Sequence, residues 1–442
     1  MVVFLKLISI AISCGLVIHA YLLRRHAGTW LTPASIWCLM WFLLTFIPLI
    51  AAPEAPANPL AILYILATSI ILSIPVFTTD WAEVRRSAEF DPPALYETRF
   101  LRVVFVVVSV AALLSLAVNF SIQGVTLDRL TSDFLSVTSD LIVDRYTQST
   151  IENVFAQLAN IFTYCSAGLG GLVFFGARRT LAKLAIVGTT MAPSLALMVI
   201  AGAKGTIFLC IALFYGAFLA ARLRRGGVNI IDKKTILVTA VSVAAIFPFL
   251  LLSFLARGLS GPMSASALED GLYRNFISYS SAHIYAFADW FTWYTGGQSA
   301  VNFAGEETTG GFYTFMSIFR AFGSEKIVPP GYYDEYFQYS WYLQTNIYTI
   351  YRGLITDFTL VGSMVFMVLF GYLVNAVFVS LTRSSDPSWS LALYILYVGL
   401  VYTSFLISVF VWNSMYPVFI ILGIIFKMNN SRVRKVKGRL PA

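Results

Sequence analysis

Long apolar stretches, joined by short polar links, make up most of this chain. A helix needs roughly 20 apolar residues to cross the hydrocarbon of a bilayer, and about eleven stretches have that length and character. Their residues are continuously apolar instead of alternating with polar ones, which favours helices over the strands of a barrel. The pattern predicts an all-α polytopic membrane protein with these transmembrane helices: Val2–Leu23, Trp30–Ala51, Leu60–Phe77, Val103–Phe120, Ile151–Phe175, Leu184–Ala201, Thr206–Ala221, Thr235–Phe254, Leu354–Leu381, Trp389–Leu406 and Val409–Phe426.

The composition agrees with this class. Hydrophobic residues make up 58% of the 442 residues and charged residues 12%, whereas soluble domains carry about a quarter charged residues. Most of the 30 lysines and arginines fall in alternate links, and the positive-inside rule places those links in the cytoplasm. The net charge of +8 then reflects topology and attraction to anionic lipids, and it gives little support for a nucleic-acid partner.

The apolar pattern stops for one long stretch that the charge pattern places outside the cytoplasm. The expected organisation is eight helices in residues 1–254, a large outer loop in residues 255–345, three helices in residues 346–427 and a basic inner tail in residues 428–442. Long structured loops in compact architectures are usually functional. We therefore expect the active site in the outer loop, part of which has a helical pattern.

Three basic residues stand where outer links meet the membrane. Lys204 lies in the turn Ala201–Gly205, Arg257 follows the eighth helix, and Arg352 stands where the chain re-enters the bilayer. An ionisable residue at this depth is a functional candidate by default, and the planar fork of arginine matches phosphate oxygens. The alternative is that these side chains reach to the interface and anchor helix ends.

Within the loop, the helical pattern of residues 271–290 brings a histidine into the candidate site. Helical spacing places Tyr279 and His283 on one stripe, and Asp289 is close enough in sequence to orient the imidazole, contact a substrate or pair with Arg274. A histidine beside a carboxylate can act as a general base. The alternative is a hydrogen-bonded packing residue among aromatic neighbours.

The loop is also rich in aromatic residues. Such side chains combine a flat apolar face with a polar tip, which suits sugars, and they equally suit an aromatic belt at the lipid headgroups. The four cysteines all lie within apolar segments and form no CxxC pair, so they predict neither a metal site nor a disulfide framework, and no cofactor is expected. The aromatic residues concerned are Trp290, Trp293, Tyr294, Phe312, Tyr313, Tyr332, Tyr333, Tyr336, Tyr339, Trp341 and Tyr342.

Two short motifs give the chain a family resemblance. The turn Ile200–Ile207, with its basic residue after a glycine, and the re-entry segment Asn346–Gly362 resemble motifs of the bacterial oligosaccharide repeat-unit polymerases, the Wzy type of O-antigen polymerase. The opening of the external loop at Arg257 is similar as well. The chain departs from the family pattern at Lys204, where arginine is common, and at Thr359, where a glycine usually follows the aromatic residue.

The resemblance, which covers roughly residues 184–372, implies a fold and a reaction. The fold is a GT-C-like helical bundle with one large, partly helical periplasmic loop in the bacterial inner membrane. The reaction transfers a growing glycan from undecaprenyl pyrophosphate onto the terminal sugar of a new lipid-linked repeat unit. The resemblance implies Arg257, Arg274 and Lys204 at the donor diphosphate, and a chain-length regulator protein as a further partner.

The remaining roles follow from the same resemblance. Arg352, beside Tyr348 and Tyr351, holds the second diphosphate or the sugar, and His283 or a loop carboxylate deprotonates the acceptor. The first outer link carries the single acid Glu54, so it lacks the paired carboxylates that would hold a metal, and a metal-independent transfer is expected. Two alternatives stay open: an O-antigen ligase that transfers to the lipid A core, and a polysaccharide transporter or flippase.

Overall fold

The computed structural model describes residues 2–92, 95–146, 149–231, 244, 247–253, 265–305, 307–324, 326 and 333–437. Within these ranges, eight helical segments are long and apolar enough to cross a membrane, which confirms an all-α polytopic membrane protein. A shorter apolar helix is α16 (Ser388–Thr403). The eight segments are α1 (Val2–Ala27), α2 (Pro33–Ala51), α3 (Pro59–Leu72) with its continuation α4 (Ile74–Thr78), α6 (Arg99–Ile122), α9 (Val154–Gly176), α10 (Thr180–Ile200), α11 (Lys204–Leu223) and α15 (Thr349–Arg383).

The other elements are shorter or more polar. They are α5 (Trp81–Arg86), α7 (Leu127–Ser132), α8 (Phe134–Tyr146), α13 (Ala265–Tyr294), α14 (Phe312–Ala321), the 3-10 turn η2 (Val409–Val411), α17 (Met415–Lys437) and a hairpin of β1 (Phe337–Gln338) with β2 (Gln344–Thr345).

Two of the predicted helices need comment. The eighth, Thr235–Phe254, falls largely outside the described residues. The last was expected from Val409 to Phe426, but the helix begins at Met415 and continues to Lys437. Ser408 caps the preceding 3-10 turn, and Pro417 is accommodated in the first turn of α17, where an N–H is not needed.

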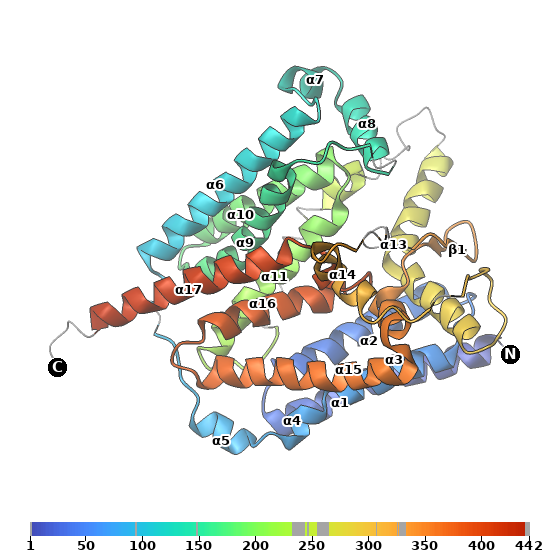
Figure 1. Cartoon of the computed structure of the whole chain (residues 1–442), viewed down its shortest axis with the longest axis horizontal. Coiled ribbons are helices and arrows are strands. Elements are labelled where there is room, and N and C mark those ends of the chain that lie inside the picture. The colour runs from blue at the N-terminus through green and yellow to red at the C-terminus, as the bar shows by residue number, and fades with distance from the viewer. Residues whose placement is uncertain are drawn as a thin grey trace. The chain divides into compact units, whose positions relative to one another are not determined.

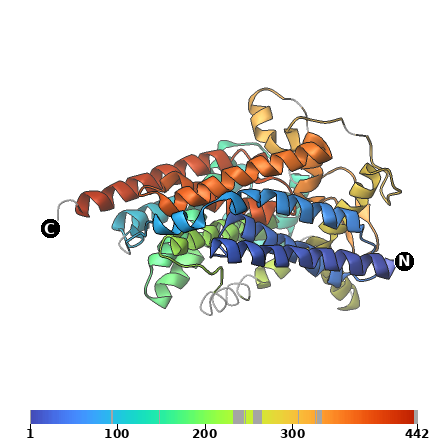
Figure 2. The same ribbon diagram turned by 90° about the horizontal axis from the view of Figure 1, so that it is seen from below.

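The described chain forms two compact units. The first comprises Met1–Ser87, Asp270–Val379 and Leu400–Asn413, and α1 to α3, coloured blue, run side by side in it (Figure 1, Figure 2). A hydrogen bond of 2.6 Å between the Ser13 and Thr45 hydroxyls joins α1 to α2. Gly371 lets α15 approach the backbone of Leu72 in α3, because a Cβ at that position has no room.

Lys6 ties α1 to α13 of the same unit. Its ammonium group donates to the Ala55 carbonyl and to the Tyr285 hydroxyl in α13, at 2.6 Å each. Tyr285 in turn donates to the Pro48 and Ala52 carbonyls at the end of α2. These bonds fix one face of α13 against the helices that precede the loop.

The second unit comprises Ala88–Glu269, Ser380–Gly399 and Ser414–Ala442. Its centre is α9, which packs against α6, α10 and α11 (Figure 1). Small residues allow this close packing, since Gly171 lies against the backbone of Phe214 in α11. The Ser109 and Ser166 hydroxyls form a buried hydrogen bond of 2.7 Å between α6 and α9.

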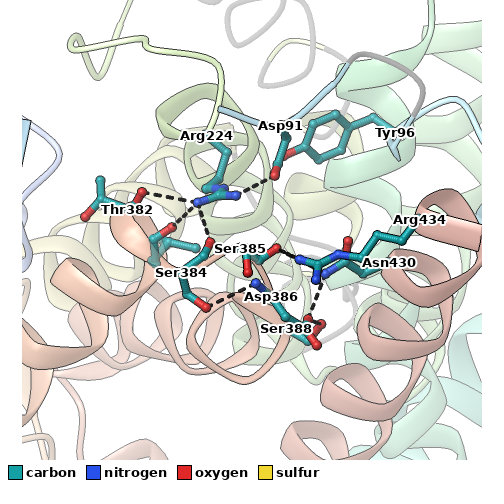
Figure 3. Close-up of polar contacts among 11 residues, drawn as sticks. Asp91, Tyr96, Arg224, Thr382, Ser384, Ser385, Asp386, Ser388, Asn430 and Arg434 are labelled. Carbon is teal, nitrogen blue, oxygen red and sulfur yellow. Dashed lines mark hydrogen bonds and ion pairs between the residues drawn. The ribbon is translucent and has the colours of Figure 1, made fainter. Parts of the chain in front are cut away.

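A buried ion pair joins several links of the second unit (Figure 3). Arg224, just after α11, contacts Asp91 at 2.6 Å, and the two side chains are 2% and 8% exposed. Tyr96 donates a 2.6 Å hydrogen bond to the same carboxylate. Arg224 also donates to three carbonyls at the end of α15 and just beyond it, those of Leu381, Thr382 and Ser384. The guanidinium thus caps a helix end whose last carbonyls have no partner within the helix.

Candidate functional site

The most unusual charged group of the first unit is Arg352, in the first turn of α15. Its side chain is completely buried, and its guanidinium carbon lies near the centres of four aromatic rings: 3.8 Å from Tyr333, 4.5 Å from Tyr348, 5.4 Å from Phe303 and 5.6 Å from Trp290. Faces of aromatic rings attract a cation, and they do so more strongly where water is excluded. The arginine predicted at the re-entry point therefore stands in an aromatic enclosure.

One carboxylate closes this enclosure. Glu335 accepts from Nη2 of Arg352 through both oxygens, each at 3.0 Å, and its side chain is 20% exposed. Tyr348 donates to the main-chain carbonyl of Glu335 at 3.0 Å. Burial raises the pKa of Tyr348, so its phenol stays protonated and keeps donating. The result is a buried cation whose counter-ion is partly exposed.

The segment that carries Glu335 is a hairpin arm, residues 333–348. The strands β1 and β2 pair antiparallel, with Phe337 opposite Thr345, and the Tyr333 N–H donates to the Asn346 carbonyl at 3.0 Å. Tyr333 and Tyr348, the two ends of the arm, are both rings of the Arg352 enclosure. The guanidinium therefore holds the base of the arm together.

Strained backbone stands at both ends of the helical segment that carries Arg352. Thr349 has φ 70° and Thr359 has φ 65° with ψ 176°, conformations that a β-branched residue adopts only when its surroundings impose them. Such strain gathers at functional sites. Thr359 also divides α15, because the helix is interrupted there before it continues to Arg383.

A buried acid, Asp357, lies in the same segment and fixes the start of α14. It accepts from the main-chain N–H groups of Tyr313 at 2.9 Å and Thr314 at 2.7 Å. The hydroxyls of Thr314 and Thr309 donate to it as well, at 2.6 Å and 2.5 Å. A carboxylate at a helix N-terminus satisfies N–H groups that have no partner within the helix. The role of Asp357 is thus to hold α14 against α15.

Thr359→Gly is expected to raise the free energy of unfolding by about 1 kcal/mol, because glycine adopts the observed φ and ψ without strain and this gain exceeds its entropic cost. Thr359→Ala is the matched control, since its Cβ retains the strain. Equilibrium unfolding in detergent micelles measures both variants. A glycine variant no more stable than the alanine variant contradicts the strain at this position.

His283 has the surroundings of a packing residue. Its side chain is 2% exposed in α13, Nε2 lies 3.1 Å from the Leu44 carbonyl, and the ring meets Phe405 edge-on at 5.3 Å. Asp289, which was expected to orient the imidazole, instead accepts from the N–H groups of Ala300 and Val301. The side chain of His283 thus points from α13 toward α2. Among the described residues, no contact joins its ring to the Glu335 carboxylate.

Burial lowers the pKa of His283 from 6.5 to about 4, against a smaller opposite effect of the bond to Leu44. Between about pH 6.5 and 4, His283 therefore binds a proton in the unfolded chain but not in the folded chain. The free energy of unfolding falls as the pH is lowered through this range. We expect a loss on the order of 3 kcal/mol between about pH 6.5 and 4 from this group. His283→Gln keeps a donor for the Leu44 carbonyl and should remove that part of the pH dependence. The free energy of unfolding of both proteins is measured at several pH values. An equal dependence on pH in the two proteins would contradict the assignment to His283.

The other predicted site residues lie in different parts of the chain's structure. Tyr351 is fully buried, with its ring 4.7 Å from that of Trp41, so it packs the interior of the first unit, and its contact with substrate stays a prediction. Tyr279 is exposed and Arg274 is half-buried on α13. Lys204 heads α11 in the second unit, where it is buried. Arg257 lies outside the described residues.

Sequence reasoning missed Glu335. It was covered only by the general expectation of a loop carboxylate as base, and the signal that could have singled it out is its position in a tyrosine-rich stretch that leads to Arg352. Searches of family models, curated proteins and solved structures give no match to this chain.

Proposed function

We propose that the protein is a glycosyltransferase that polymerises undecaprenyl-pyrophosphate-linked oligosaccharide repeat units on the periplasmic face of the bacterial inner membrane. The observation that carries the proposal is the Arg352–Glu335 pair in its aromatic enclosure. It combines a guanidinium for a diphosphate, a carboxylate for a proton and aromatic faces for a sugar. The motif resemblance around residues 200–207 and 346–362 supports the same reaction.

The chemistry assigns one role to each member of the pair. An acceptor hydroxyl oxygen bonds to the anomeric carbon of the donor glycan, and the bond from that carbon to the diphosphate oxygen breaks. The electron pair of the broken bond stays on the diphosphate, whose growing charge Arg352 neutralises. The proton of the acceptor hydroxyl passes to Glu335.

The two roles are linked, because the diphosphate and the Glu335 carboxylate compete for the same guanidinium. In the described conformation Glu335 occupies the guanidinium of Arg352 at 3.0 Å. A diphosphate that takes over the guanidinium releases the carboxylate, and a carboxylate without a cationic partner is the stronger base. Glu335 also has the exposure that His283 lacks, at 20% against 2%.

Purified protein in proteoliposomes, supplied with lipid-linked repeat units, is expected to build a ladder of polymer lengths without added nucleotide or divalent metal. A chelator should leave the ladder unchanged. Gel separation of the glycan products measures it. Product formed only on a lipid A core acceptor would instead identify a ligase, and unmodified repeat units appearing on the opposite side of the bilayer would identify a flippase.

Glu335→Gln is expected to lower the rate of ladder formation by about 100-fold, the usual size of a general-base contribution. The amide keeps the shape of the side chain and one oxygen that can accept from Arg352, but it does not take the proton. Asp334→Asn is the matched control, because Asp334 is the adjacent acid and is exposed. Equal rates for the two variants would rule out Glu335 as the base.

A further inference from the structure

The structure separates the loop aromatics into two groups. Those around Arg352 are buried, but Trp341 is 53% exposed, and Tyr273 of α13 is 46% exposed. Three rings gather here: Tyr273 lies 6.1 Å from Trp341 and 5.6 Å from Tyr342, and the latter two are 5.4 Å apart. We call Tyr273, Trp341 and Tyr342 the aromatic platform.

Hydrogen bonds hold the platform in place. The Ser278 hydroxyl of α13 donates to the Tyr342 carbonyl at 2.9 Å and accepts from the Gln344 N–H at 3.3 Å. Farther along the arm, the Tyr339 hydroxyl donates to the Glu54 carbonyl at 3.0 Å. Exposed rings on a fixed backbone lose little freedom when a ligand settles on them, so the platform is prepared for binding.

The charges around the platform restrict what it can bind. Exposed acids lie on the elements that carry it or contact it: Asp270 in α13, Asp334 in the arm and Glu54 beside Tyr339. The half-buried Arg274 is the base next to Tyr273 in sequence. The ammonium of Lys6 acts on Glu54, but Lys6 is buried, and the exposed carboxylates of Asp270 and Asp334 still disfavour anionic headgroups and acidic polymers. They do not repel an uncharged ligand.

We propose that the aromatic platform binds an uncharged saccharide, the glycan portion of the lipid-linked substrate. Ring faces cover the C–H surfaces of sugars, while the phenol and indole tips hydrogen-bond their hydroxyls. Two of the platform's three rings, Trp341 and Tyr342, belong to the same arm whose base encloses Arg352 through Tyr333 and Tyr348. The inference rests on the proposed function for the identity of the glycan, and the binding surface itself is independent of catalysis.

Two probes distinguish a saccharide surface from an aromatic belt. The first is the free oligosaccharide released by mild acid from lipid-linked repeat units of the source strain, and the second is a phosphatidylcholine vesicle with brominated acyl chains. The contribution of Trp341 is obtained by subtracting the fluorescence of Trp341→Phe from that of the wild type. We expect the oligosaccharide to change that fluorescence and the brominated lipid to leave it unquenched; quenching by the lipid without a response to the oligosaccharide overturns the platform.

Variants test the same surface without relying on fluorescence. Trp341→Ala and Tyr273→Ala should each weaken oligosaccharide binding at least tenfold in calorimetry, whereas Phe322→Ala, at a side chain that is 88% exposed, should leave it unchanged. Unchanged binding in both platform variants overturns the inference. Binding is measured without turnover, so the two proposals can fail separately. A protein that binds the oligosaccharide but builds no ladder refutes the polymerase and keeps the platform. A protein that builds a ladder but does not bind the oligosaccharide at the platform refutes the platform and keeps the polymerase.

Discussion

Arg352→Met is expected to lower polymer formation by about 100-fold or more, the usual effect of removing one donor that stabilises developing negative charge. Methionine is preferred to alanine because it fills most of the space between the four rings, where alanine would leave a cavity. Arg352→Lys keeps the charge but not the planar fork that holds two phosphate oxygens, so we expect an intermediate rate. Initial rates of ladder formation at saturating substrate measure the series.

Stability has to be separated from catalysis in this series, because Arg352→Met leaves the Glu335 carboxylate without its partner. The double variant Arg352→Met/Glu335→Gln removes both charges and should recover folding stability without recovering activity. Unfolding in detergent and the ladder assay are therefore read on the same preparations. Activity that returns together with stability in the double variant would show that the pair only supports the hairpin arm.

The sequence predicts the helical class well and the site only in part, for a physical reason. An apolar stretch of bilayer length predicts a helix from its own residues alone, and helices such as α6 and α9 are predicted in this way. Arg352 could be found in the same way, as a charge beside a span. Its partner Glu335 could not, because that contact depends on how the hairpin arm closes across intervening residues.

The helix α13 shows the same limit from the other side. Its helical pattern was predicted, but the pattern does not say which stripe faces the interior. The carbonyl of Leu44 and the ring of Phe405, both distant in sequence, meet the His283 stripe and bury it. Likewise, Tyr351 and Arg352 are neighbours in sequence, yet they point into different surroundings, one among Trp41 and the core rings and the other toward Glu335.

Arg224→Met is expected to cost the second unit about 3–5 kcal/mol, the usual effect of leaving one member of a buried ion pair without its partner. Asp91 would stay buried without a cation, and the carbonyls of Leu381, Thr382 and Ser384 would lose the guanidinium as a donor (Figure 3). Equilibrium unfolding of the full chain in mixed micelles measures the loss. Hydrogen exchange at residues 380–388 should speed up as well, because the end of α15 loses its cap.

The chain supplies its own control for this prediction. Arg178 pairs with Glu97 at 3.0 Å in the same unit, but the two side chains are 81% and 35% exposed, and exposed pairs contribute about 0–1 kcal/mol. Arg178→Met should therefore leave the unfolding curve nearly unchanged. The double variant Arg224→Met/Asp91→Asn removes the uncompensated charge and should recover part of the loss. Equal losses for Arg178→Met and Arg224→Met would mean that burial does not set the strength of these pairs, and the anchoring role of Arg224 would fail with it.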